Sequence, residues 1–207
     1  IEDDTVTDAP SKGNQEGIFG YGQVSATKHS TTNLVSNVGV VGTDVTGVGT
    51  ARSYLAATEY GGDKGIFGFG GWSPSEIAET NLVSNAGVVA TDVTGVGTTR
   101  YALAACGYGD DKGIFGFGGS YDSMTNLVSN AGVVATDTTG VGTARRGLAA
   151  CEYGGDKGIF GFGYDGSDAS MTNLVSNVGV VATDVTGVGT ARSWLAACGY
   201  GYDKGIF

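Results

Sequence analysis

The chain has 207 residues, of which 39 are Gly, 2 are Pro and only 15% are charged. Gly occurs at about two and a half times its usual ~7% frequency, which disfavours helices, while 41% hydrophobic residues provide enough apolar surface to exclude wholesale disorder. The 21 acidic side chains outnumber the 11 basic ones, and the net charge of −10 argues against a nucleic-acid partner.

Residues 1–15 form an acidic N-terminal segment, IEDDTVTDAPSKGNQ. This segment has neither the basic start nor the apolar stretch of a signal peptide. No later run approaches the ~18 consecutive apolar residues of a membrane span, so we expect none. These features do not fix a compartment, and a virion or extracellular location is our expectation.

The rest of the chain consists of internal repeats. The motif GIF occurs at 17–19, 65–67, 113–115, 158–160 and 205–207. A second block, TNLVSN followed by a glycine-rich stretch ending in Arg, begins at Thr32, Thr80, Thr125 and Thr172. Residues 16–207 are therefore predicted to form a single repeat domain, with units at about 16–63, 64–111, 112–156 and 157–207.

Each unit is predicted to contain four short strands, exemplified by residues 103–108, 113–118, 126–130 and 133–138. Turn sequences such as YGDDKG and SNAG separate them and supply the residues that hairpins require. A helix is disfavoured because the alternate glycines of GIFGFG would each cost about 1 kcal/mol.

Four antiparallel strands in ~47 residues are typical of one blade of a β-propeller. The predicted fold is all-β, a propeller of four such blades closed by the N- and C-terminal strands. Closure would pair the inner strand at 195–200 with the first GIF strand at 17–22. The fifth GIF strand is surplus in that scheme, and it leaves five blades or an oligomeric ring as alternatives.

From Arg192 onward, the string RSWLAACGYGYDKGIF resembles the kelch repeat, with an Arg, a small-residue strand, a glycine hairpin and an apolar strand. Gly70-Gly71 and Gly118-Gly119 stand where kelch repeats carry a double glycine. The fourth strand departs from that family because VATD replaces the usual Trp. The motif also resembles repeats in predicted phage virion and tail proteins. The kelch resemblance implies a propeller.

Three residue types recur at fixed positions and are interpreted as structural. They are the arginines Arg52, Arg100, Arg145 and Arg192, the aspartates Asp44, Asp92, Asp137 and Asp184, and the cysteines Cys106, Cys151 and Cys198. We expect the arginines to join neighbouring blades, although they could instead ring the axis. The aspartates are expected to accept N–H bonds in the turn before the glycines, with calcium binding as the alternative. The cysteines are expected to be small buried side chains rather than an axial metal site.

Positions that differ between units are the candidates for ligand binding. The loop between the second and third strands changes length, and in a propeller it shares a face with the residues after each Arg. The predicted binding residues are Tyr54, Trp72, Tyr101, Tyr121, Arg146, Tyr164 and Trp194. Aromatic rings among short polar side chains suit a glycan or a protein epitope, although loop drift would also produce such variation.

An enzyme is not expected. The chain has one histidine, His29, and no G-x-S-x-G or HExxH motif, so we predict no catalytic residue, cofactor or metal. The sequence predicts a non-catalytic module that binds a glycan or protein through one face, in a virion or at a surface. The alternative is a structural protein, a virion or filament building block, that forms homo-oligomers through blade edges.

Overall fold

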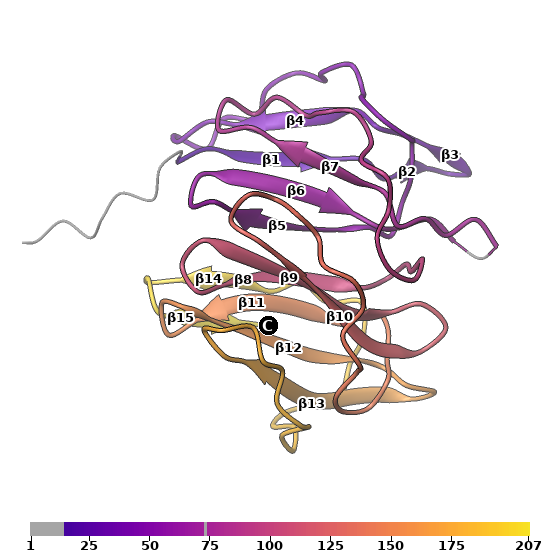
Figure 1. Cartoon of the computed structure of the whole chain (residues 1–207), viewed down its shortest axis with the longest axis vertical. Coiled ribbons are helices and arrows are strands. Elements are labelled where there is room, and N and C mark those ends of the chain that lie inside the picture. The colour runs from indigo at the N-terminus through magenta and orange to yellow at the C-terminus, as the bar shows by residue number, and fades with distance from the viewer. Residues whose placement is uncertain (1–14, 73) are drawn as a thin grey trace, which may run out of the picture.

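The computed structural model describes residues 15–72 and 74–207, so the acidic segment predicted over residues 1–15 lies outside them except for residue 15. The described residues form fifteen β-strands and no helix, arranged as six small antiparallel sheets (Figure 1). The all-β prediction is therefore confirmed. The described residues offer no helix with the length and hydrophobicity needed to cross a membrane.

Three sheets have three strands each. The second sheet contains β5 (Ala56–Tyr60), β6 (Lys64–Gly68) and β7 (Thr80–Val83). The third contains β8 (Ala104–Tyr108), β9 (Lys112–Gly118) and β10 (Asp122–Val128). The fourth contains β11 (Ala149–Tyr153), β12 (Lys157–Tyr164) and β13 (Asp168–Val175). Each strand pairs with the next in the chain, as the predicted hairpin turns require.

The remaining sheets have two strands each. The first pairs β1 (Gly17–Gly20) with β4 (Thr32–Val35), and the fifth pairs β14 (Cys198–Tyr200) with β15 (Lys204–Ile206). A small hairpin of β2 (Gln23–Val24) and β3 (Thr27–Lys28) extends from the first sheet. β14 thus pairs with the hairpin strand that follows it, which needs a much shorter loop than the predicted partner at 17–22.

The predicted fourth strand of each unit differs from expectation. In the third sheet, the segment after β10 forms no continuous strand and pairs with β10 through isolated bridges at Val134 and Thr138. The side chain of Asn126 takes part in this contact, because its Nδ2 donates to the carbonyl of Ala135 at 3.0 Å and to the carboxylate of Asp137 at 2.9 Å. Side-chain bonds therefore replace part of a regular ladder.

Neighbouring sheets pack face to face through a phenylalanine on one and a glycine on the other. Phe160 on β12 is fully buried, and its ring lies against Gly116 of β9. A side chain at Gly116 would not fit there, because its Cβ would lie only 2.8 Å from the ring. Phe67, Phe115 and Phe207 face Gly20, Gly68 and Gly161 in the same way. The alternating glycines of GIFGFG are thus the sites where the next sheet approaches closely.

The first four sheets follow one another along the longest axis of the molecule, and the fifth packs beside β11 (Figure 1). The hydrophobic core lies between these sheets, in one cluster centred on Phe69 and Phe115 and a second centred on Phe117 and Phe160. The inner strands β5, β8, β11 and β14 line a common cavity of about 510 Å³. Equivalent strands of four units therefore face one space.

Candidate functional site

The residues just before the inner strands gather at one end of those strands. Tyr54, Ala102, Gly147 and Trp194 hold equivalent positions, and each has φ between +52° and +59°. Backbone hydrogen bonds join these four residues in a series. The N–H of Ala102 donates to the carbonyl of Tyr54 at 2.8 Å, that of Gly147 to the carbonyl of Ala102 at 2.9 Å, and that of Trp194 to the carbonyl of Gly147 at 2.7 Å. A left-handed conformation is costly for Tyr, Ala and Trp, so these inter-unit bonds fix residues that would otherwise avoid it.

An apolar cavity of about 230 Å³ opens at the centre of this group. Four leucines at equivalent positions line it, together with the aromatic residues Tyr54 and Trp194: Leu55, Leu103, Leu148 and Leu195. The ring centroids of Tyr54 and Trp194 are 6.2 Å apart, although the two residues come from the first and last units of the series. Two exposed rings therefore border a small apolar hollow.

The variable loops add further rings beside this cavity. Trp72, from the loop after β6, lies 5.0 Å from the ring of Tyr54 and 4.7 Å from that of Tyr101. Tyr121, from the turn after β9, and Tyr164, the last residue of β12, have ring centroids 6.2 Å apart. These loops were predicted to share a face, and the structure places their aromatic residues together.

Arg146 connects the two groups of rings. Its guanidinium carbon lies 5.0 Å from the centroid of Tyr121, 5.8 Å from that of Tyr101 and 6.0 Å from that of Trp72. All seven residues predicted as ligand-binding thus form one continuous series of contacts. We call this surface the aromatic face: Tyr54, Trp72, Tyr101, Tyr121, Arg146, Tyr164 and Trp194.

The aromatic face combines exposed rings with a buried support. Trp194 is 55% exposed and Trp72 43%, whereas Tyr101 is only 3% exposed and its hydroxyl accepts a hydrogen bond from Nη1 of Arg146. Exposed Tyr and Trp rings supply apolar contact area, and these rigid side chains lose little conformational entropy when a ligand binds. The face can therefore stack against a flat apolar ligand surface, with Tyr101 acting as a positioning residue.

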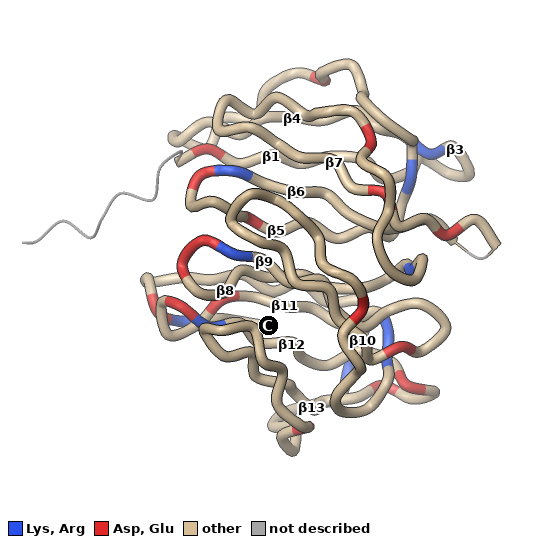
Figure 2. The backbone as a smooth tube through the Cα atoms, in the orientation of Figure 1, with Lys and Arg blue, Asp and Glu red and all other residues tan. Residues whose placement is uncertain are grey.

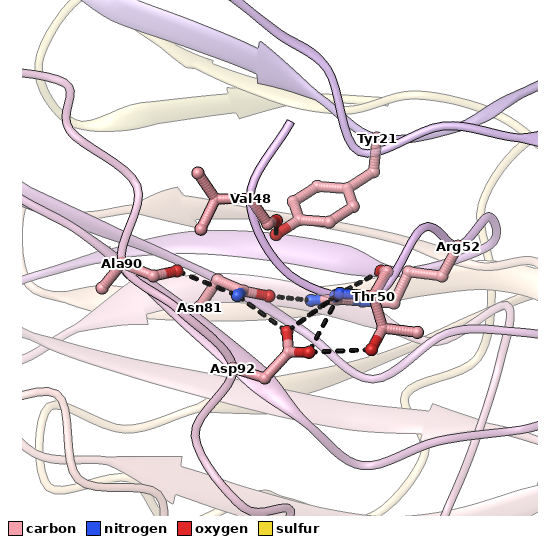
Figure 3. A network of polar contacts seen from close by, with 7 residues as sticks. All are labelled: Tyr21, Val48, Thr50, Arg52, Asn81, Ala90 and Asp92. Atoms are coloured by element: carbon pink, nitrogen blue, oxygen red, sulfur yellow. Dashed lines mark hydrogen bonds and ion pairs between the residues drawn. The ribbon is translucent and has the colours of Figure 1, made fainter. Parts of the chain in front are cut away.

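The repeated arginines lie between successive sheets. Arg52 is 1% exposed, stacks on Tyr21 of the first sheet at 4.2 Å, and donates from Nη2 to Oδ1 of Asn81 in the second sheet at 2.7 Å (Figure 3). Its Nη1 lies 3.9 Å from the carboxylate of Asp92. Thr50 also bonds that carboxylate through its N–H and its hydroxyl. One arginine therefore contacts two sheets at once.

The same arrangement, which we call the arginine junction, occurs three times: Thr50, Arg52, Asn81 and Asp92; Thr98, Arg100, Asn126 and Asp137; Thr143, Arg145, Asn173 and Asp184. The three asparagines are completely buried. Neither these asparagines nor the threonines were among the predicted structural residues, although both recur identically in the repeated blocks.

The aspartates of these junctions accept from a different donor than predicted. The amide of Thr50 that bonds Asp92 belongs to the glycine-rich stretch of the preceding block, whereas the expected donors lay in the turn after Asp92 itself. Burial acts to raise the pKa of Asp92, but the hydrogen bonds from Thr50 and Asn81 together outweigh it, so the pKa is lowered. Burial also lowers the pKa of Arg145 to about 10, which leaves its guanidinium charged at neutral pH.

The junctions are incomplete at the two outer sheets. Arg192 stacks on Phe162 at 4.1 Å, but its Nη2 donates to the carbonyl of Phe207 at 3.2 Å in place of an asparagine. In the first sheet, Asp44 accepts from Asn33 at 2.8 Å, and among the described residues no arginine contacts it. In the described chain, the first sheet thus has the asparagine and aspartate of a junction without an arginine, and Arg192 is a junction arginine without the asparagine and aspartate.

The cysteines face the neighbouring sheet. A Cβ on Gly158 would lie 2.6 Å from the sulfur of Cys106, and a Cβ on Gly205 would lie 2.5 Å from that of Cys151. All three thiols are free. Cys106 and Cys151 are buried as expected, and burial raises the pKa of both thiols, but Cys198 on β14 is exposed, so the expectation of a buried side chain is wrong at that position. In the described part of the chain, no group of three His, Cys, Asp or Glu residues has the arrangement of a metal site.

The chain was also compared with known proteins. No protein-family model matches the sequence, and the search of the curated proteins finds no match either.

Proposed function

We propose that the protein is a non-catalytic β-propeller of four blades that binds a glycan or protein ligand through the aromatic face. The observation that carries this proposal is that the six aromatic residues of the predicted site, with Arg146, form one contiguous and partly exposed surface.

The face-to-face packing of the sheets supports the propeller assignment. Four equivalent inner strands line one cavity, and the backbone bonds from Tyr54 to Trp194 pass through four units. The ring contact between Tyr54 and Trp194 brings the first and last members of that series together. Around a central axis, four blades would produce these contacts, whereas a straight stack of sheets would separate its ends.

The contrast between constant and variable positions supports the binding role. The arginine junctions are the same in every complete unit, and their arginines and asparagines are buried, as expected of residues that hold sheets together. The aromatic face differs at every unit and is exposed at Trp72 and Trp194. Exposed aromatic rings that a rigid scaffold fixes in place are typical of recognition surfaces.

Trp194→Ala and Trp72→Ala test the proposal. Loss of a central aromatic anchor costs at least about 2 kcal/mol of binding, so each variant should bind a ligand from a glycan-array screen roughly 30-fold more weakly. Titration calorimetry measures the affinity. Tyr200→Ala is the matched control, since this 54% exposed ring lies on β14 away from the aromatic face. Equal losses in all three variants would contradict the proposal.

Assembly with other copies is the second candidate function, and the outer sheets favour it. Phe19 is 65% exposed, whereas Phe67 at the equivalent position is only 4% exposed. Asp44 and Arg192 each lack the partner that their equivalents have. A second copy could join them, and sedimentation over a concentration series would then show association that Arg192→Ala weakens.

A further inference from the structure

We propose that the ligand of the aromatic face is a glycan carrying a carboxylate, and that Arg146 binds this carboxylate. The inference rests on the proposed function and deepens it by naming the chemical class of the ligand. It depends on the fixed geometry of Arg146, its unused donors and the charges around it.

Arg146 is held in place before any ligand arrives. Its N–H donates to the carbonyl of Tyr164 at 3.0 Å, and its carbonyl accepts from the N–H of Tyr164 at 2.8 Å. Its Nη1 donates to the hydroxyl of Tyr101 at 2.6 Å, while Tyr121 stacks on the guanidinium. A guanidinium fixed by backbone, hydroxyl and ring contacts loses little conformational entropy on binding.

The guanidinium keeps donors that no described residue uses. Nε is buried and makes no hydrogen bond, and Nη2 donates to no described residue either. An unused buried donor is costly in a folded protein, and a bound anion that accepts from it would remove that cost. Together, Nε and Nη2 form the planar edge that binds a carboxylate through two parallel hydrogen bonds.

Most other cations of the described chain already have anionic partners. Arg52, Arg100 and Arg145 lie beside aspartates in the junctions. Lysines pair with the preceding aspartate at hairpins such as the one entering β6, at the end of the sheets opposite the aromatic face (Figure 2). Arg146 forms no ion pair with a described carboxylate. Its charge is therefore available to an anion.

The surroundings of Arg146 favour a singly charged sugar. With a net charge of −10, the protein repels polyanions, so a sulfated or phosphorylated polymer is disfavoured relative to one carboxylate. The C–H face of a pyranose is apolar and stacks on aromatic rings, which Trp72 and Tyr54 provide at adjoining positions. Because the guanidinium carbon lies 6.0 Å from the centroid of Trp72, a sugar stacked there would place a ring substituent beside Arg146.

Esterification provides the test. Sialyllactose and a disaccharide with a single galacturonate residue are titrated calorimetrically against the full chain, each beside its own methyl ester, which keeps the sugar and removes only the one negative charge. We expect at least one acid to bind about 10- to 100-fold more tightly than its ester, as a charged bidentate bond would provide. Arg146→Gln should reduce that preference to less than about twofold, and Arg146→Lys should restore it only in part.

Lys157→Gln is the matched control, because it removes one positive charge at the opposite end of the same sheet. It should leave the preference for the acid unchanged, and the thermal midpoints of all variants should agree. Equal binding of acid and ester, with Trp194→Ala still weakening both, would overturn this inference and leave the proposed function standing. If none of these sugars binds, both the carboxylate inference and the proposal that the aromatic face binds a glycan are rejected. Arg146-dependent binding of an aspartate-rich peptide alone would make the ligand a protein.

Discussion

Arg145→Ala should destabilise the protein by about 3–5 kcal/mol, because removal of one partner from a buried charged network leaves the other partners unsatisfied. Arg145 is completely buried and donates to the carbonyl of Phe162 at 2.7 Å, to that of Thr143 at 2.9 Å and to the side chain of Asn173 at 2.6 Å. Asn173 is itself completely buried. In the variant, its side-chain oxygen would face a cavity without a donor. Urea unfolding at equilibrium measures the loss.

The chain contains its own control for this substitution. Arg192 occupies the same repeat position but is only partly buried, and its guanidinium bonds the carbonyls of Thr190 and Phe207. Arg192→Ala should therefore cost about 1 kcal/mol, mostly from the lost contact with Phe162. Unfolding is measured in dilute solution, so that association between copies does not contribute. Equal losses for the two variants would show that the asparagine and aspartate contribute nothing to the junction.

The repeats made the first three strands of each unit and the position of the aromatic face predictable from the sequence. A constant period places equivalent residues at equivalent points of each sheet, so the rings at the variable positions had to lie near one another once the units packed together. Tyr54 and Trp72 lie in different loops, yet their rings are 5.0 Å apart. The relative positions of equivalent residues follow from the constant repeat length and can therefore be predicted from the sequence.

The arginine junctions were only partly predictable. The repeated arginines and aspartates were expected to be structural, but the role of Asn81 depends on which side chain meets Arg52 across two strands. Spacing along the chain does not contain that information. A strand was predicted at residues 133–138 for a related reason: its valines are typical of a strand, whereas the bonds of the Asn126 side chain replace part of the ladder in the structure. Polar side chains that compete with backbone pairing are not visible in a hydrophobic pattern.

The pairing of the outer strands was missed because the five GIF strands are nearly identical. β15 forms a hairpin with β14, and its Phe207 occupies the position on Gly161 that Phe160 occupies on Gly116. The first GIF strand could in principle fill the same place, since its sequence is the same. Choice between equivalent strands depends on loop length, which favours the local hairpin.

Phe160→Ala should also cost about 3–5 kcal/mol, since the ring is completely buried between two sheets and contacts Phe117 edge-on at 5.2 Å. Phe19→Ala removes the same side chain at the same repeat position, but that ring is 65% exposed and its loss should change stability by no more than about 0.5 kcal/mol. Urea unfolding of both variants compares them directly. A similar cost at both positions would mean that the sheets are not held together by these rings.

A second substitution separates ring packing from a general loss of hydrophobic area. Gly116→Ala alone should destabilise the protein, because the added Cβ would lie 2.8 Å from the ring of Phe160. In the Phe160→Ala background that ring is absent, so the closest clash would disappear and only the tighter contact with Cγ2 of Thr125, at 3.1 Å, would remain. The two substitutions should therefore couple by about 1–2 kcal/mol, the double variant being more stable than the sum of the singles predicts. Additive effects would contradict the close approach of the sheets at Gly116, and with it the explanation for the alternating glycines of the repeat.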